Sequence, residues 1–228
     1  MKKLILVALS VTLVLVLGIA AVPAGANLPS AKATAQIAKL NVVSAVYTTD
    51  VNQYLTDDTG WTPILTQEIK TANQKDLFIS PSLQSALLTA TRVSSKDLTP
   101  DTSSALAGVA VKVEVDGIAA FPGATGVIYN QRLQVLSAKL AGLLNTTTGI
   151  VDPEEISLLL DTLSVNSFNF IVPDLTSGVH TVVVYAKAYT TVSNQQGSAG
   201  ARALIGLGSV TVEEVRMIKG ENVIVELP

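Results

Sequence analysis

The chain has 228 residues, no cysteine, 14% charged residues and a net charge of −3 at pH 7. Without cysteine, neither a disulfide framework nor a lipid anchor on a cysteine thiol can form. The charges are scattered along the sequence, which disfavours nucleic acid and anionic membranes as partners, since both require clustered Lys and Arg.

The first 26 residues have the three parts of a cleavable export signal. Lys2 and Lys3 form a basic start, residues 4–17 an uncharged apolar run, and Ala24-Gly25-Ala26 a small-residue cleavage site. Cleavage removes two of the 15 basic residues and none of the 18 acidic ones, so the net charge moves from −3 to −5. An uncleaved membrane anchor over residues 4–22 is the alternative. The signal predicts a secreted or cell-surface protein, periplasmic if the host has an outer membrane, with no membrane contact after cleavage.

Residues 27–36 read as a flexible leader, and residues 37–228 as a single elaborated β-sandwich domain. In this domain, short apolar runs rich in Val, Leu and Thr alternate with turn residues, which is typical of strands. Strands are predicted over residues 39–49, 61–70, 77–93, 107–115, 118–121, 127–135, 179–191 and 203–217. The segment 77–93 is expected to hold one long or two short strands bent near Pro81, and 94–104 is expected to be a polar loop.

A β-hairpin is predicted around Asp116-Gly117. Valines at the odd positions of residues 109–115 alternate with Ala, Lys and Glu, so they face one side of a sheet. Asp and Gly both tolerate the positive φ angles that a two-residue turn requires. Residues 118–121 are therefore expected to return as the second strand.

Two segments break the pattern of strands. Leucines at helical spacing make the second half of residues 133–144 ambiguous between an extended strand and a helix. Residues 153–163 have clearer helix signals. Asp152 suits the N-cap, Pro153 the first helical position, and the carboxylates of Glu154-Glu155 the positive end of the helix dipole. The sequence therefore predicts one short helix, over 153–163, packed on the edge of a sheet.

The stretch 167–191 is the most diagnostic part of the domain. An aromatic strand with Phe168 and Phe170 is followed by a turn, and a long strand returns from Val179. This stretch resembles the corner between the fifth and sixth strands of immunoglobulin-like sandwiches in secreted bacterial proteins. The matching residues are Leu175, Gly178, His180, Thr181, Val182, Val184 and Ala186.

The resemblance implies an antiparallel, immunoglobulin-like β-sandwich, here without a disulfide, organised over residues 107–218. Leu175 would close the open end of the sandwich, and Gly178 would supply a turn conformation. The core cluster expected from this corner is Phe168, Phe170, Leu175, Val182 and Val184. The resemblance implies no particular activity, because one sandwich fold carries many functions.

No combination of side chains in the sequence predicts a catalytic, cofactor-binding or metal site. His180 is the only histidine, so one chain cannot supply a His-based triad or a two-His metal site. Its place in the corner predicts a structural role, with the ring bonded to nearby backbone. Glu154 and Glu155 point in different directions, which suits helix capping better than glycoside hydrolysis.

Two binding alternatives depend on acidic and aromatic residues. Calcium could take oxygen ligands from Asp50, Asp57 and Asp58, or from Asp97 and Asp101, although the spacing lacks the EF-hand pattern. A platform for sugar rings could form from the aromatic residues, but these make up only 4% of the chain, so packing in the core or on strand surfaces is preferred. The aromatic residues concerned are Tyr47, Tyr54, Trp61, Tyr129, Tyr185 and Tyr189.

The sequence therefore predicts an exported, non-catalytic β-sandwich protein without a cofactor. It would serve as a surface, matrix or accessory binding module, with an extracellular protein or a cell-surface component as partner. The main alternative is a self-assembling, pilin-like subunit, a homo-oligomer in which residues 27–50 are donated as a strand to a neighbour's open edge. A hydrolase or metal-dependent enzyme is the third and least supported class.

Overall fold

The computed structural model describes residues 33–72 and 74–217, and these residues form thirteen strands. In chain order they are β1 (Ala33–Thr48), β2 (Tyr54–Asp58), β3 (Thr62–Thr71), β4 (Lys75–Ser95), β5 (Pro100–Val115), β6 (Ile118–Ala119), β7 (Val127–Lys139), β8 (Leu143–Asn145), β9 (Ile150–Asp152), β10 (Glu154–Ser167), β11 (Phe170–Leu175), β12 (Gly178–Asn194) and β13 (Ser198–Val215). The predicted signal, 1–26, lies outside the described residues, whereas residues 33–36 of the predicted leader already belong to β1. Within the described ranges, no helix is both long and apolar enough to cross a membrane.

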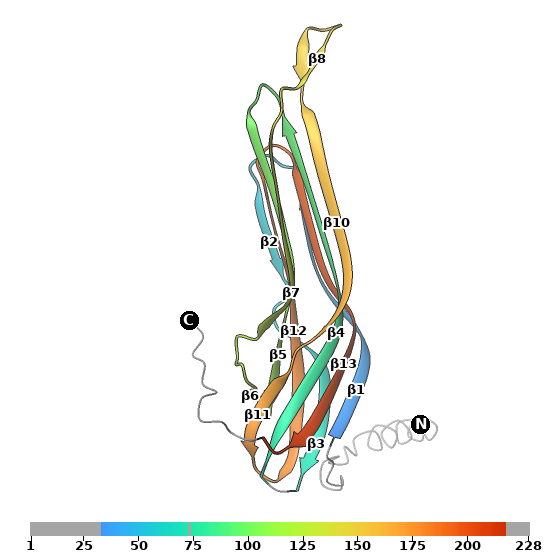
Figure 1. Cartoon of the computed structure of the whole chain (residues 1–228), viewed down its shortest axis with the longest axis vertical. Coiled ribbons are helices and arrows are strands. Elements are labelled where there is room, and N and C mark those ends of the chain that lie inside the picture. Colours follow the sequence, from blue (N-terminus) through green and yellow to red (C-terminus); the bar gives the residue numbers. More distant parts are fainter. Residues whose placement is uncertain (1–32, 73, 218–228) are drawn as a thin grey trace, which may run out of the picture. The chain divides into compact units, whose positions relative to one another are not determined.

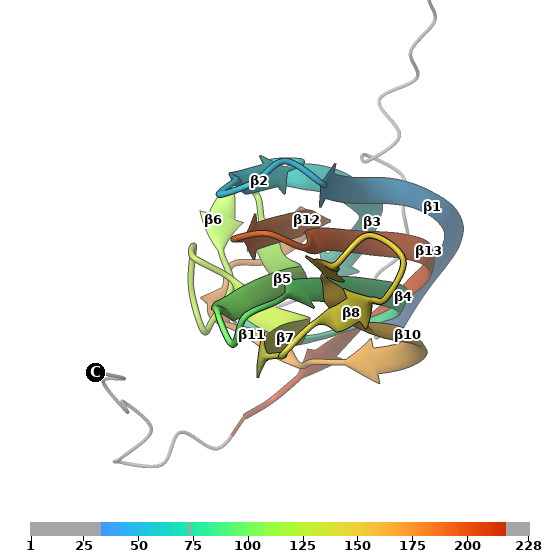
Figure 2. The same ribbon diagram turned by 90° about the horizontal axis from the view of Figure 1, so that it is seen from above.

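Two antiparallel sheets contain most of these strands (Figure 1). Sheet A has the order β1-β13-β4-β10, and β11 follows β10 along the same side of β4. Sheet B has the order β2-β12-β5-β6, with β3 also paired to β12 and β7 to β5. Seen along the strands, the sheets lie face to face, and β1 curves from sheet A toward β2 and β3 (Figure 2). The predicted all-β antiparallel sandwich is confirmed.

The predicted hairpin lies between β5 and β6. Asp116 and Gly117 have φ angles of 52° and 82°, and Val115 pairs with Ile118 directly beyond them. The odd-numbered valines of β5 face the interior and are fully buried. Strict alternation of apolar and polar residues, closed by a turn that needs positive φ, is the kind of local information that fixes a strand and its register.

The side chains that β4 contributes to the interior change from apolar to polar along the strand. Toward Lys75 the inward side chains are large and aliphatic, including Leu77, Ile79 and Leu83. Toward Ser95 several are small and polar, and these are hydrogen-bonded across the sandwich. The Oγ1 atom of Thr89, for example, donates to Oε1 of the buried Gln134 side chain at 2.8 Å. Buried polar groups are tolerated here because they find partners.

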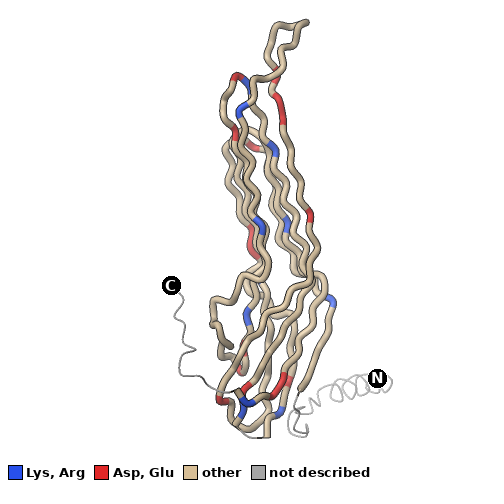
Figure 3. The backbone as a smooth tube through the Cα atoms, viewed as in Figure 1, with Lys and Arg blue, Asp and Glu red and all other residues tan. Residues whose placement is uncertain are grey.

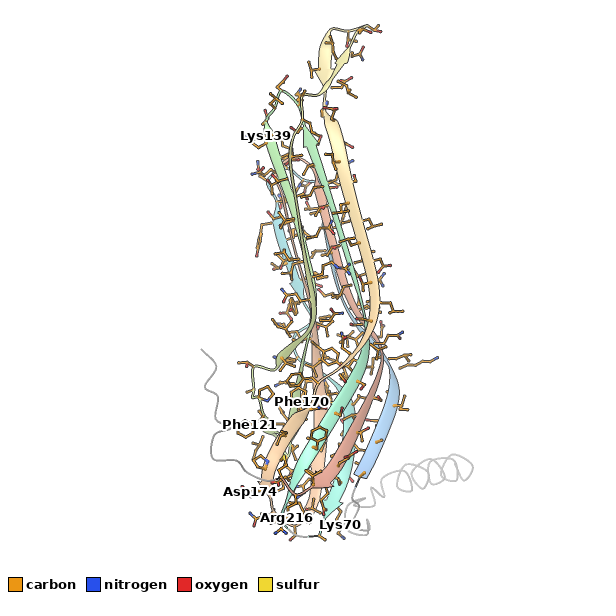
Figure 4. All side chains as sticks on the ribbon, in the orientation of Figure 1. Lys70, Phe121, Lys139, Phe170, Asp174 and Arg216 are labelled. Carbon is orange, nitrogen blue, oxygen red and sulfur yellow. The ribbon has the colours of Figure 1, made fainter. Side chains whose placement is uncertain are left out.

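Phe170 fills the aliphatic half of the interior, where it points between the sheets (Figure 4). It is fully buried, as predicted, together with Val182 and Val184, and Leu175 packs against this core while partly buried. The prediction for Phe168 was wrong. Its ring contacts Phe170 edge-to-face at 5.2 Å between centroids, yet 40% of the residue is exposed, because it precedes β11 and is covered on one side only.

The helix predicted over 153–163 is also wrong. All 14 residues of β10 pair with β4, from Glu154 opposite Ser95 to Ser167 opposite Ser82. A helix cap contributes about 1 kcal/mol, whereas the long free side of β4 offers a ladder of backbone hydrogen bonds over the whole segment. The ambiguous second half of 133–144 forms no helix either: β7 continues along β5 to Lys139, and β8 begins at Leu143.

Two other boundaries shift for the same reason. β4 is a single strand that continues through Pro81, which stands opposite Val210 of β13. The predicted loop over 94–104 shrinks to residues 96–99, because pairing with β7 begins at Pro100.

Candidate binding surface on the outer face of sheet B

The outward face of sheet B carries a cluster of aromatic and charged side chains. On β12, Val184, Ala186 and Ala188 face the core and are fully buried, so the alternate residues Tyr185, Lys187 and Tyr189 face outward. On the neighbouring strand β5 the outward residues are Lys112 opposite Tyr185, Ala110 opposite Lys187 and Gly108 opposite Tyr189. Strand register alone therefore places two tyrosines and two lysines on one surface.

Lys112 connects two rings that are far apart in the sequence. Its Nζ atom lies 5.4 Å from the centroid of the Trp61 ring and 4.8 Å from that of Tyr185, which is the range of cation–π attraction. The same Nζ is 2.7 Å from Oε1 of Glu114. The hydrogen bond from Lys112 lowers the pKa of Glu114, while partial burial, aided by the Glu114 charge, raises the pKa of the Tyr185 hydroxyl.

The rings of Tyr189 and Trp61 each lie against a glycine, which leaves room for the ring because it has no side chain. A Cβ atom on Gly108 would lie 2.4 Å from the Tyr189 ring, so this ring rests directly on bare backbone. A Cβ atom on Gly126 would lie 2.7 Å from the Trp61 ring, and Gly126 also has a φ of +72°, which favours glycine. Burial raises the pKa of Tyr189. The two rings therefore have little freedom to move toward the sheet.

The polar part of the surface is an ion pair between Lys187 Nζ and Asp58 Oδ2. Desolvation of the Asp58 carboxylate opposes ionisation, but the hydrogen bonds from Lys187 and from the Gly60 N–H, at 2.7 Å, prevail and lower the pKa of Asp58. Around this pair lies an open hollow of about 630 Å³. Its lining includes Thr56, Trp61, Thr125, Ile128 and Tyr189.

The hollow thus brings together ring faces, hydroxyl groups, carboxylates and an ammonium group from four separated segments. Of the six aromatic residues considered as a platform, Trp61 and Tyr189 line this hollow, and Tyr185 lies beside it on the same face of sheet B, near Lys112. Tyr129 instead lies in the core, where its hydroxyl accepts from the Leu83 N–H at 2.9 Å and burial raises its pKa to about 12. The position of Lys112 beside these rings was not predicted from the sequence, because it depends on the pairing of β5 with β12.

His180 lies in the corner, as predicted. Its Nε2 atom is 2.8 Å from the backbone oxygen of Thr176, which confirms the expected bond to nearby backbone. Its Nδ1 atom is 2.7 Å from Oδ2 of Asp116, the hairpin residue, whose other oxygen accepts from the Thr181 N–H at 2.8 Å. Asp116 therefore ties the hairpin to the start of β12, a contact that the sequence did not suggest.

The acidic residues considered for chemistry are dispersed. Glu154 accepts a hydrogen bond from the Gly142 N–H at 2.9 Å, and Glu155 forms an ion pair with Arg92 at 3.2 Å; both belong to a strand rather than to a helix terminus. Asp101 is buried and accepts from two backbone N–H groups. Over residues 33–72 and 74–217, no three His, Cys, Asp or Glu side chains gather as a metal site. The charges of both signs are spread along the strands (Figure 3).

Comparisons with known proteins add little to this geometry. No protein-family model and no curated protein matches the chain. Among solved structures, the chain is similar to latent PorU from Porphyromonas gingivalis at 9% identity and a TM-score of 0.18, with 84% of this chain and 13% of that one covered. It is also similar to the CBM36-1 domain of a xylanase from the hindgut metagenome of Trinervitermes trinervoides, at 8% identity and a TM-score of 0.14, over 78% of this chain and 96% of the other. At these TM-scores the similarities carry no argument.

Proposed function

We propose that this protein is an exported, non-catalytic binding module and that the outer face of sheet B binds a carbohydrate chain. The observation that carries the proposal is the preformed cluster of Trp61, Tyr189 and the Asp58–Lys187 pair around an open hollow. We also propose the narrower immunoglobulin-like relationship, which the corner at 167–191 supports. If the outer face of sheet B binds carbohydrate, the partner is a cell-surface or matrix glycan.

The chemistry of a sugar suits this surface. A sugar ring has an apolar face of C–H groups and a rim of hydroxyls, so it requires an aromatic ring next to groups that donate and accept hydrogen bonds. Tyr189 supplies the ring, and Asp58 and Lys187 supply charged hydrogen-bonding groups beside it. Since glycines and ion pairs already fix these side chains, binding would cost little conformational entropy.

The charge state of the carboxylates favours binding over hydrolysis. Glycoside hydrolysis needs a carboxylic acid that is still protonated near neutral pH, and therefore a raised pKa. The pKa values of Asp58 and Glu114 are lowered instead, because each carboxylate is hydrogen-bonded to a lysine. Both groups stay ionised, which suits hydrogen-bond acceptance from sugar hydroxyls.

Trp61 makes the proposal directly testable, because it is the only tryptophan of the chain and lies at the hollow. Its fluorescence would be titrated with β-1,4-linked oligosaccharides of glucose, xylose, galactose and N-acetylglucosamine. We expect a saturable change in emission with at least one of them. Tyr189→Ala should weaken that binding at least tenfold. Tyr47→Ala is the matched control, because Tyr47 is exposed on β1 in the other sheet.

The proposal would be abandoned if no oligosaccharide changed the emission, or if the Tyr189 and Tyr47 variants bound equally well. Export has its own test. Intact-mass analysis of the protein from the export fraction should show Asn27 as the first residue. Retention of residues 1–26 would favour the membrane-anchored alternative.

The pilin-like alternative would require a rearrangement of β1. Of the proposed donor segment, 27–50, residues 33–48 form β1, which is paired with β13 of its own sheet. Donation would therefore require β1 to leave that sheet. A different strand, β10, has the features of a contact between protein chains.

A further inference from the structure

β10 is an edge strand with an apolar surface on both of its faces. It ends the order of sheet A and has a neighbour, β4, on one side only. Its apolar side chains are 41–69% exposed, as are two on the adjacent edge strand β7. They are Ile156, Leu158, Leu159, Leu160, Leu163 and Val165 on β10, with Leu133 and Val135 on β7. A gathering of exposed apolar side chains along one edge usually marks an interface.

The opposite edge of sheet A is covered. β1 is tied to sheet B by hydrogen bonds that bridge the two layers. The Thr66 N–H donates to Oε1 of Gln36 at 2.8 Å, and Ser44 Oγ donates to the backbone oxygen of Asp57 at 3.0 Å. β10 lacks the Lys, Pro and Gly residues that often protect an exposed edge, since its 14 residues include no Lys, Arg, Pro or Gly.

The strand is nevertheless fixed in place from the interior. Gln134 of β7 donates from Nε2 to the backbone oxygen of Leu158 at 2.8 Å, and the Tyr129 hydroxyl donates to that of Asn166. Each carbonyl keeps a second lone pair for an additional bond. These contacts hold the β10 backbone extended and its outward side chains in position, so the edge is preorganised for a partner.

We propose that a second copy of this chain binds along this edge, with the two β10 strands antiparallel about a two-fold axis near Leu159. The proposal is independent of the carbohydrate surface on sheet B. The exposed apolar residues of β10 and β7 offer an area on the order of several hundred Å² per protomer, against the ~800 Å² per partner of a standard interface.

The placement of the charges favours an antiparallel pair over a parallel, in-register one. β10 has three acidic residues, Glu154, Glu155 and Asp161, and no basic ones. Centred on Leu159, an antiparallel pair puts Asp161 opposite Ser157 and Glu155 opposite Leu163, so no two carboxylates face each other. A parallel, in-register pair would set each acid against its own copy, which is destabilising. Because a two-fold interface uses the same patch on both copies, it closes as a dimer and does not propagate into a filament.

The absence of cysteine allows a direct test, because one introduced thiol is the only thiol in the chain. Leu159→Cys places it near the proposed axis. Val165→Cys places it on the same face but about 40 Å from its copy, at ~3.3 Å per residue. Ile37→Cys, on the opposite edge and 82% exposed, is the control for random collision. The exported protein would be oxidised mildly and the disulfide-linked dimer followed over time.

We expect the Leu159 variant to cross-link at least tenfold faster than the other two, and the wild-type protein to sediment as a dimer. Leu159→Lys combined with Leu163→Lys should sediment as a monomer with an unchanged β-rich circular-dichroism spectrum. Equal rates in all three cysteine variants would overturn the proposal, as would rapid cross-linking through Val165, which indicates parallel strands. A monomeric wild type at 100 µM, or filaments in electron micrographs, would overturn it as well.

Discussion

Replacing Phe170 with alanine tests the assignment of the core most directly. Phe170 is fully buried and is the largest of the fully buried side chains, and β11 places it opposite Ile79 of β4. Emptying such a site costs about 3–5 kcal/mol. The upper part of that range is expected, because the edge-to-face contact with Phe168 contributes about 0.5–1.5 kcal/mol and is also lost.

Urea unfolding followed by circular dichroism would measure this loss, with the slope of the transition checked for a change in the unfolded state. For a domain of this size, 3–5 kcal/mol corresponds to a drop in melting temperature of about 6–20 °C. Phe168→Ala is the matched control. Because Phe168 is 40% exposed, its replacement should cost clearly less. Equal costs for the two variants, or a cost below about 1 kcal/mol for Phe170→Ala, would refute the assignment.

Three further predictions concern the binding surface and the polar interior. Gly108→Val should displace the Tyr189 ring and reduce oligosaccharide binding in the Trp61 fluorescence titration, since even a Cβ atom would lie 2.4 Å from that ring. Asp58→Asn should lower stability by no more than about 1 kcal/mol, because the pair with Lys187 is partly exposed. The folded pKa of Asp58 lies below its ordinary value of 3.8, so this contribution is present above about pH 4 and is lost as the pH falls through the folded pKa. Gln134→Leu should cost about 1–3 kcal/mol in urea unfolding, because it leaves buried hydrogen-bonding groups without a partner.

Each of these predictions has a matched control. Gly206→Ala should bind as the wild type does, because its Cβ would lie no closer than 3.6 Å to another side chain. The stability difference between wild type and Asp58→Asn should shrink as the pH falls below about 4, and a difference that grew with acidity would contradict the lowered pKa. A Thr99→Val variant, in the exposed turn before β5, should leave stability unchanged where Gln134→Leu does not.

The sequence alone predicts the structure of a segment correctly where the conformation depends on a few adjacent residues. The alternating valines of β5 and the Asp116-Gly117 turn specify a strand, its inward face and its return, because period and turn type are properties of a few adjacent residues. The burial of Phe170 with Val182 and Val184 was predicted from the corner at 167–191, although the same pattern wrongly placed Phe168 in the core. The sandwich as a fold class was therefore accessible from the sequence.

Tertiary structure decided whatever depends on a partner distant in the chain. Residues 153–163 have the caps and leucine spacing of a helix, yet they form β10, because the unpaired side of β4 provides hydrogen bonds along the whole segment. Likewise, the Asp116–His180 contact spans 64 residues.

The binding surface and the apolar edge also depend on contacts between segments that are distant in the chain. Lys112 lies near both Trp61 and Tyr185 only because β12 pairs with β5 in one particular register, and a shift of β12 by one residue would turn its tyrosines inward. The leucines of β10 are exposed only because β10 is the last strand of its sheet. A sequence specifies which side chains alternate, but the order of strands in a sheet decides which of them face a partner.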